Sequence, residues 1–281
     1  MFAAPSLLPP PPLPLLPPLA PAKPMHRLAL DGGRLDAVLQ GGLALAACHE
    51  IYGAGTGAGA TAFALMLALA CPRPGPILWV ADGWDDNGML HGAGLAELGG
   101  DPARLWLVAA GGVVPMLRAA GEAQRCAALG TLVIESHGEA KAIDLTVTRR
   151  LQLAAAAHGV FTLLLRSGQP RPSACSSRWE AQPAPARQLA AGAPGPPRLT
   201  ISLTRQRGGP ADIKQVLEWN RDRCSFQSGE SRHDTDAIRF GITPIGAGFA
   251  RRPSNDASPH PGARAAVVAG GAAGAGWRRA G

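Results

Sequence analysis

Lysine is scarce in this chain: Lys23, Lys141 and Lys214 are its three lysines among 281 residues. All three lie far in sequence from a glycine-rich stretch at residues 53–59. Proteins that hydrolyse nucleotides with a glycine-rich loop use a lysine of that loop to contact the β- and γ-phosphates. The lack of a lysine near the glycines therefore argues against a conventional ATPase loop.

Cysteine pairs and membrane-spanning segments are also missing. The five cysteines are widely separated, with no Cys-x-x-Cys pair and no histidine at zinc-finger spacing, so we expect reduced, mostly buried thiols and no metal site. Residues 1–24 are mostly proline and leucine, and prolines exclude a spanning helix there. No basic residue precedes this apolar part, as a secretory signal would require. We expect a cytoplasmic protein without membrane contact.

The composition divides the chain into three parts. Residues 1–24 and the glycine-, alanine- and arginine-rich residues 228–281 lack apolar periodicity, and both are expected to be disordered. Residues 25–227 form the expected domain. The formal charge is +7, of which the tail contributes about +3, leaving about +4 on residues 1–227. Such a charge is compatible with nucleic-acid binding, but arginine replacing lysine beside abundant Ala, Gly and Pro also indicates a compositional bias.

Apolar strands alternate with amphipathic helices from residue 48 to residue 165. One or two helical turns are expected at 35–39, strands at 48–52, 77–80, 105–108, 131–134 and 160–165, and helices at 60–70, 90–98, 113–129 and 144–158. Continuous apolar strands separated by helices predict an α/β fold with a mainly parallel sheet covered on both faces. In the last helix, Leu145, Val147, Leu151 and Leu153 predict the buried face.

The pattern changes after residue 166. A strand is expected around 178–180, a loop at 183–197, and strands at 199–203 and 215–219 joined through a turn at 208–210. No pattern is visible from about Phe226. Residues 166–227 therefore predict a short extension of two antiparallel strands beside the parallel sheet.

The glycine-rich stretch joins the first strand to the first long helix, which is where phosphate-binding loops lie. Taking Gly53 as the first glycine of G-x-x-x-x-G-K-[ST] places Gly59 at the lysine and Ala60 at the hydroxyl. A frame ending at Gly59, Ala60 and Thr61 restores the second glycine and the hydroxyl but places Ala60 at the lysine. Neither frame gives an ATPase loop. Two interpretations stay open, namely weak phosphate binding by backbone amides and the helix dipole, or a purely structural turn.

The candidate nucleotide-binding residues are the loop glycines, the loop hydroxyl and two acidic residues at strand ends. They are Gly53, Gly55, Gly57, Gly59, Thr61, Asp82 and Glu135. Glu135 ends the strand at 131–134, where hydrolysing proteins place a carboxylate for magnesium, and Asp82 follows the strand at 77–80. Ordinary solvated carboxylates would give the same pattern. His137 is interpreted as a surface residue, because the histidines show no metal-ligand spacing.

The same stretch also reads Gly53-x-Gly55-x-x-Ala58, which satisfies the dinucleotide fingerprint G-x-G-x-x-[GA]. Asp82 would then accept the ribose hydroxyls of NAD. Against this alternative, Glu50 interrupts an otherwise apolar first strand, and no downstream catalytic constellation is visible. An NAD-type oxidoreductase is the second alternative function.

These residues resemble two related families. The entry to the loop at 50–53 resembles that of RecA-type recombinases, and residues 132–136 resemble their second nucleotide motif with Glu135 in place of aspartate. Asp82 lies where those proteins carry a catalytic glutamate. The closer resemblance is to the ImuA family of RecA- and SulA-like proteins, over about residues 28–227. The segments that carry it are 49–63, 76–80, 92–99, 101–105, 125–129, 145–165, 177–180 and 205–226.

The resemblance to the ImuA family implies a RecA-like fold and an accessory role in mutagenic translesion DNA synthesis after DNA damage, within the SOS response. It implies an ImuB-like protein, an error-prone polymerase and RecA as partners. Separately from the resemblance, DNA contact stays open, either indirect or through the arginine-rich tail at 228–281. We expect no catalytic residue and no hydrolysed cofactor, since no cation near the loop offsets phosphoryl charge. ATP or another nucleotide held without efficient hydrolysis stays open.

The first alternative function is a weak or DNA-stimulated ATPase of the RecA superfamily. It would need an arginine delivered from elsewhere in the fold or from a partner. Arg149, Arg150 and Arg166 are the candidates in this chain. Sheet-edge contacts between recombinase protomers also suggest, by analogy of fold, that the sheet edge and residues 198–219 contact partners.

Overall fold

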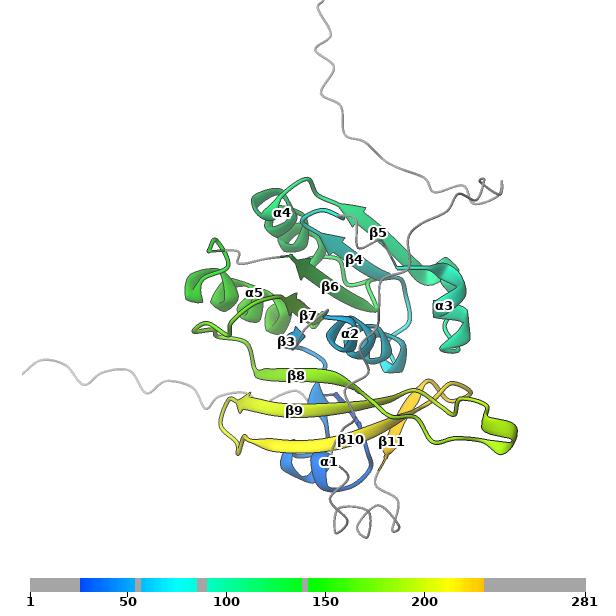
Figure 1. Cartoon of the computed structure of the whole chain (residues 1–281). Helices are drawn as coiled ribbons and strands as arrows, with labels where there is room; N and C mark the ends of the chain where they lie inside the picture. Colours follow the sequence, from blue (N-terminus) through cyan, green and yellow to red (C-terminus); the bar gives the residue numbers. More distant parts are fainter. Residues whose placement is uncertain (1–25, 54–56, 85–89, 138–140, 230–281) are drawn as a thin grey trace, which may run out of the picture. The chain divides into compact units, whose positions relative to one another are not determined.

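The computed structural model describes residues 26–53, 57–84, 90–137 and 141–229 (Figure 1). From residue 48 to residue 166 strands alternate with helices, and mostly strands follow after residue 166. In chain order, the elements are β1 (Arg27–Leu28), α1 (Arg34–Val38), β2 (Leu43–Ala44), β3 (Cys48–Gly53), α2 (Ala58–Ala70), β4 (Ile77–Ala81), α3 (Gly92–Glu97), a 3-10 turn (Pro102–Arg104), β5 (Leu105–Ala109), α4 (Val113–Ala123), β6 (Thr131–Ser136), α5 (Leu145–His158), β7 (Phe161–Arg166), β8 (Ser177–Ala184), a second 3-10 turn (Ala190–Gly192), β9 (Arg198–Gln206), β10 (Ile213–Asn220) and β11 (Ser225–Ser228).

Nine strands form one sheet in the order β11-β10-β9-β8-β3-β7-β6-β4-β5. All neighbours from β8 to β5 are parallel, whereas β9, β10 and β11 are added antiparallel beside β8. The short strands β1 and β2 pair with each other in a separate antiparallel sheet. Parallel neighbours need crossover connections. Helices supply the crossovers between β3 and β7, whereas a loop at 167–176 connects β7 to β8. The predicted mainly parallel α/β sheet is confirmed.

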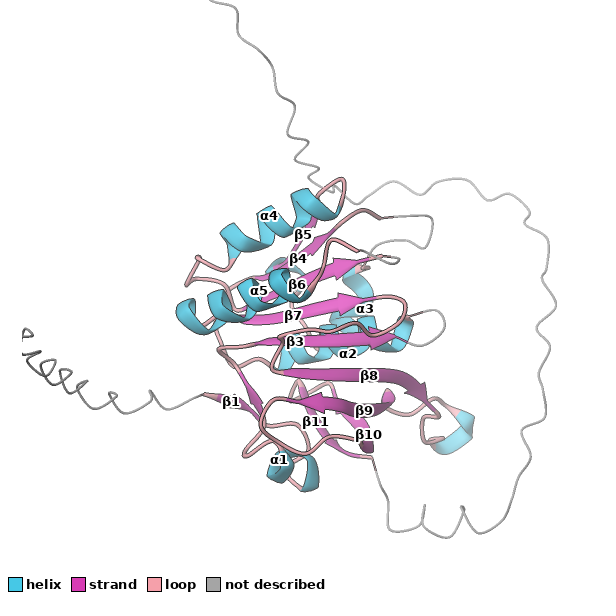
Figure 2. Ribbon diagram, turned by 90° about the vertical axis from the view of Figure 1, so that its left-hand side faces the viewer, coloured by secondary structure: helices cyan, strands magenta, loops and turns pink. Residues whose placement is uncertain are grey.

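Helices cover both faces of the parallel strands (Figure 2). Alternate residues of each strand point to opposite faces, so Val133 of β6 packs toward α2 while Leu132 and Ile134 pack toward α4 and α5. Helix α2 packs against β3, β7 and β8, and it also meets β11 of the antiparallel extension. A helix enclosed in this way is apolar on all sides, which explains the continuous alanine and leucine run in its sequence.

An aromatic cluster joins α2 to the antiparallel strands. The ring of Phe63 lies 5.8 Å from that of Trp179 on β8 and 5.7 Å from that of Phe226 on β11. Phe226 in turn meets Trp219 of β10 edge to face, with ring centroids 5.0 Å apart. Such pairs add to the burial energy of each ring. The extension is therefore part of the same hydrophobic core as α2.

The extension differs from its prediction in two respects. It has three antiparallel strands and not two, because β11 occupies the stretch from Phe226 that shows no sequence pattern. Pairing with β10 and burial of Phe226 on α2 stabilise this four-residue strand. In addition, β8 continues to Ala184, into the expected loop at 183–197, because β9 pairs with it along its whole length.

Two helices differ from their predicted form. Helix α4 ends at Ala123 and not at residue 129. The buried Gln124 amide follows it and donates to the Leu151 carbonyl at 2.9 Å, which fixes the point where the helix ends. On α5 the predicted apolar face is wrong in part: Leu145 and Leu153 are more than half exposed, and Thr148, Leu151 and Ala155 face the sheet.

The described cysteines are all free thiols, and Cys48, Cys71 and Cys175 are buried, as expected for most of them. The Cys48 and Cys175 sulfurs lie 3.4 Å apart. Their shared hydrogen bond, together with burial, raises the pKa of the Cys48 thiol well above its usual value. Within the described residues, no helix has the length and apolar character needed to cross a membrane.

Candidate functional site

The glycine turn lies at the carboxyl end of β3, where it leads into α2. Ala54, Gly55 and Thr56 lie outside the described residues. Gly57 precedes the helix with φ of 75°, a left-handed conformation that glycine adopts without steric cost. Its carbonyl accepts hydrogen bonds from the Ala60 and Thr61 amides at 2.9 and 3.1 Å, so these two amides are already used within the turn.

Both positions that would carry the missing lysine are closed. At Gly59 an added Cβ would lie 2.7 Å from the Ala181 carbonyl oxygen and 2.8 Å from the Gln182 Cα, because β8 passes directly against the helix. Ala60 is fully buried, and its Cβ lies against Gly53. A lysine at either position would have to displace the backbone of β8 or β3. The start of α2 therefore does not fit the lysine that a nucleotide loop needs.

The two predicted acidic residues lie side by side. Asp82 follows β4, Glu135 is on the neighbouring β6, and the Asp82 amide donates to the Glu135 carbonyl at 3.1 Å. The carboxyl ends of parallel neighbours meet at one edge of the sheet, which is why residues far apart in sequence come together. The pairing that the strand order implies is therefore present.

Both carboxylates already have protein partners. Asp82 accepts hydrogen bonds from the Ser136 hydroxyl and the His137 amide, each at 3.0 Å, and its side chain is 11 % exposed. Glu135 accepts a 2.7 Å hydrogen bond from the Trp79 indole nitrogen and is 14 % exposed. Among the described residues, no group of three or more acidic, histidine or cysteine side chains is placed to hold a metal ion.

His137 connects the two carboxylates. Its Nδ1 lies 2.9 Å from Asp82 Oδ1, and its Nε2 lies 3.7 Å from Glu135 Oε1. About a third of the side chain is exposed, so the interpretation as a simple surface residue misses these contacts. The residue follows β6 directly, and its proximity to Asp82 depends on the order of the strands. The His137 imidazole thus lies between Asp82 and Glu135, at the place where a cation held by both carboxylates would lie.

A buried ion cluster lies on β3 just before the glycine turn, and it is the main feature that sequence reasoning missed. Glu50 is fully buried, with Oε1 at 2.9 Å from Arg166 Nη1 and Oε2 at 2.9 Å from Arg178 Nε. Both guanidinium groups lie beside the ring of Tyr52, at 5.7 and 5.6 Å from its centroid. Burial, with the Glu50 charge nearby, raises the pKa of the Tyr52 hydroxyl.

The cluster holds Arg166, one of the three arginines that a slow ATPase could use, in contacts within the protein. Arg166 is 5 % exposed and is held by Glu50 and by the Ile143 carbonyl. Arg149 and Arg150 are exposed on α5. The sequence signal for the cluster is Glu50 within an otherwise apolar strand, which by itself argues only against a dinucleotide site.

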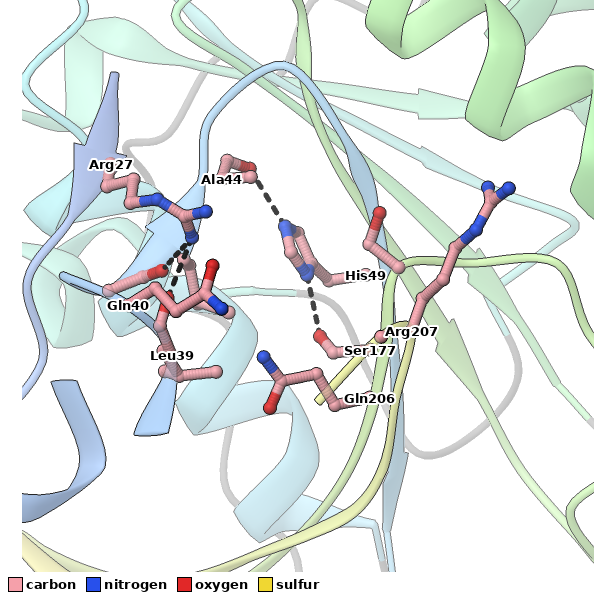
Figure 3. Close-up of a pocket in the computed structure, with 12 residues that line it drawn as sticks. Arg27, Leu39, Gln40, Ala44, His49, Ser177, Gln206 and Arg207 are labelled. Atoms are coloured by element: carbon pink, nitrogen blue, oxygen red, sulfur yellow. Dashed lines mark hydrogen bonds between the residues drawn. The ribbon is translucent and has the colours of Figure 1, made fainter. Parts of the chain in front are cut away.

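A small polar cavity of about 140 Å³ lies at the opposite end of β3 (Figure 3). His49 crosses its wall, with Nδ1 2.6 Å from the Ser177 hydroxyl and Nε2 2.9 Å from the Ala44 carbonyl. The Trp179 indole also donates to Ser177, at 2.6 Å. Burial lowers the pKa of His49 to about 4, so the ring is neutral near pH 7. Both nitrogens of the His49 ring have hydrogen-bond partners, and the bond to Ser177 links β3 to β8.

The sequence is similar to Protein ImuA of Caulobacter vibrioides (strain NA1000 / CB15N), with 37 % identity over 233 residues, 72 % of this chain and 88 % of the relative. Protein ImuA of Caulobacter vibrioides (strain ATCC 19089 / CIP 103742 / CB 15) matches to the same extent. No protein-family model matches the chain. The fold is similar to the crystal structure of the RadB recombinase, with a TM-score of 0.50 at 16 % identity over 70 % of this chain and 96 % of that one.

The likeness to the recombinase confirms the expected RecA-like fold. The identity to Protein ImuA extends over most of both chains and confirms the resemblance expected from the sequence segments. The chain belongs to the ImuA family.

Proposed function

We propose that the chain is a RecA-like accessory protein that supports damage-induced translesion DNA synthesis through protein contacts and without hydrolysing ATP. The closed start of α2 is the observation that carries this proposal. Gly59 lies against the backbone of β8, and Ala60 is buried against Gly53, so neither of these described positions can carry a lysine that reaches a terminal phosphate. Without a cation there, the charge on a transferring phosphoryl group is not offset.

The acidic pair supports the same proposal. A hydrolysing site needs a carboxylate free to hold magnesium through water. Asp82 is occupied by Ser136 and His137, and Glu135 accepts from Trp79. The vestigial nucleotide site formed by the turn, Asp82 and Glu135 would then at most hold a nucleotide weakly, through backbone amides.

Family membership supports the role in mutagenesis. As a member of the ImuA family, the chain would act with an ImuB-type protein, an error-prone polymerase and RecA. The antiparallel extension is our candidate contact surface, because its exposed charges are mostly basic. Its exposed basic residues are Arg187, Arg207, Lys214, Arg221 and Arg223, and its exposed acidic residues are Asp212 and Asp222. A basic surface favours acidic partners and suppresses basic ones.

Nucleotide turnover separates this proposal from a weak ATPase. Purified full chain should release no phosphate from MgATP, with or without single-stranded DNA. Turnover that disappears in Glu135→Gln would overturn the proposal and support the weak or DNA-stimulated ATPase. Calorimetry with NAD and NADP tests the oxidoreductase alternative, which predicts binding that is lost in Asp82→Asn.

Partner binding is tested with charge reversals on exposed residues of the extension. Deleting residues 198–226 would remove core side chains such as Leu203 and Trp219, so point variants are the better probe. Lys214→Glu and Arg207→Glu should weaken capture of an ImuB-type protein or RecA, and Arg149→Glu on α5 is the matched control. Mutagenesis after DNA damage should fall in the Lys214→Glu and Arg207→Glu variants and stay unchanged in Arg149→Glu. Equal capture by all variants would remove the extension as the contact surface.

Direct DNA binding through the arginine-rich tail is a separate prediction. A chain ending at Gly229 should lose any salt-sensitive affinity for DNA, because phosphate contacts release counterions. Affinity that survives this truncation would place DNA contact outside the tail.

A further inference from the structure

Strand β5 forms one edge of the nine-stranded sheet. It is the last strand in the sheet order, and within the described part of the chain it pairs with β4 alone. The free side of an edge strand presents unpaired backbone N–H and C=O groups, and proteins usually protect it with charges, prolines or bulges. The sequence of β5, Leu-Trp-Leu-Val-Ala, contains no charge and no proline, and its register with β4 is regular.

The side chains of β5 make this edge apolar as well. Trp106 is 57 % exposed and Val108 is 38 % exposed, and both point to the same face because they are two residues apart. By contrast, Trp79, Trp179 and Trp219 are fully buried. Helix α4 lies on this face and packs over β4 and β6 (Figure 1). Trp106 and Val108 therefore stay exposed beside it.

We propose that a second copy of this chain docks on this edge, with β5 pairing antiparallel to β5 of the other copy about a two-fold axis at Leu107. In that register Leu107 lies opposite Leu107 of the second copy. Trp106 lies opposite Val108 of the second copy, and the same pair recurs on the other side of the axis. Leu105 lies opposite Ala109 of the second copy. The two sheets then continue into each other.

The strand favours a second copy over an unrelated partner because it is complementary to itself. Pairs of an aromatic and a β-branched side chain stabilise antiparallel neighbours, and the two-fold register forms this pair twice. The uncharged strand offers no charge that would select an oppositely charged partner. A two-fold contact also involves the same strand in both copies. It therefore covers the β5 edge of each copy and ends at a dimer, without building a fibre.

The proposed contact is small, which sets its expected strength. Stable interfaces bury about 1,200 Å² or more in total, and one pair of five-residue strands provides less than this. We therefore expect a monomer–dimer equilibrium that depends on protein concentration. The docking goes beyond the proposed function and does not depend on it.

Sedimentation equilibrium of the full chain over a range of concentrations tests the docking. The wild type should show a reversible dimer. Trp106→Glu and Val108→Lys should each raise the dissociation constant at least about tenfold, because each homodimer would bury two unpaired charges. Leu153→Glu is the matched control: this residue is 59 % exposed on α5, and the variant should dimerise like the wild type.

Mixing the two variants tests the register itself. A Trp106→Glu chain paired with a Val108→Lys chain places the new carboxylate opposite the new ammonium and restores one tryptophan–valine pair. The mixture should therefore form a heterodimer where neither variant forms a homodimer. A wild type that is monomeric at all concentrations, a dimer that persists in Trp106→Glu, or a mixture that stays monomeric would each overturn the proposal.

Discussion

Replacement of Glu50 by glutamine should strongly destabilise the protein. Glu50 is fully buried and holds Arg166 and Arg178 with contacts of 2.9 Å each, and it accepts a 3.1 Å hydrogen bond from the Tyr52 hydroxyl. Glutamine has nearly the same shape but no charge, so two largely buried guanidinium groups would lose their counter-ion. Breaking a buried pair by removing one partner costs about 3–5 kcal/mol.

That loss is a large part of a typical domain's stability, which is about 5–15 kcal/mol. Urea unfolding followed by tryptophan fluorescence and far-UV circular dichroism would measure it. Glu97→Gln is the control, because Glu97 is exposed on α3 and its replacement should change the unfolding free energy by less than about 0.5 kcal/mol. A loss below about 1 kcal/mol for Glu50→Gln would refute the argument.

A combined variant distinguishes lost charge balance from lost packing. Replacing the whole cluster by apolar residues, as Glu50→Leu, Arg166→Met and Arg178→Met together, removes the charges and their desolvation cost at once. Such replacements are often neutral or stabilising. The triple variant should therefore unfold at a higher urea concentration than Glu50→Gln. If the triple variant is the less stable one, packing of the arginine stems outweighs charge balance in this cluster.

Three further predictions concern stability. Burial lowers the pKa of His49 from 6.5 to about 4, so the unfolded chain takes up a proton before the folded chain does as the pH falls. About 2 kcal/mol of stability should therefore be lost between pH 7.5 and pH 5. Urea unfolding at the two pH values should show this loss in the wild type and not in His49→Gln. Gly59→Ala should cost about 1–3 kcal/mol by pressing on β8, while Gly94→Ala on α3, where an added Cβ meets nothing within 4 Å, should not destabilise; equal melting temperatures would contradict this. Phe63→Ala should cost about 3–5 kcal/mol in urea unfolding because its ring joins Trp179 to Phe226, and a cost below about 1 kcal/mol would show that the cluster does not hold the extension.

The parallel half of the fold was predictable because its central strands are buried on both faces. Such strands are continuous apolar runs, and residues 77–80 and 131–134 are recognisable without knowing their neighbours. The antiparallel half was less predictable. The strand at Phe226 is four residues long with one buried side chain, and it depends on pairing with β10 and on contact with α2. Local sequence does not contain those contacts.

The buried face of α5 failed for a related reason. Leu145 and Leu153 are apolar but exposed, whereas the polar Thr148 is fully buried. Its hydroxyl donates within the helix to the Asp144 carbonyl at 3.0 Å and accepts from the Ala174 amide at 3.1 Å. A buried hydroxyl is tolerated when it is hydrogen-bonded, and its partner here is 26 residues away. Apolar periodicity alone therefore identified Leu151 correctly but also selected the exposed Leu145 and Leu153.

The candidate site was predictable in its positions but not in its contacts. Strand ends identify Asp82 and Glu135, since carboxyl ends of parallel strands share one edge. That His137 closes the pair depends on which strands are neighbours, and the sequence does not state the strand order. The same holds for Glu50, whose partners Arg166 and Arg178 come from the two strands flanking β3.

The glycine turn has a structural reason to exist without any phosphate. An added Cβ at Gly53 would lie 2.6 Å from the Gly57 Cα, Gly57 has a positive φ, and Gly59 lies against the Ala181 carbonyl. Gly53 and Gly59 are therefore required by the close approach of the backbone in β3, α2 and β8, and Gly57 is required by its left-handed conformation. The approach of α2 to β8 is also what carries Phe63 into the aromatic cluster of the extension. A chain that had lost nucleotide chemistry would still need this turn, because it joins the parallel sheet to the antiparallel strands through α2.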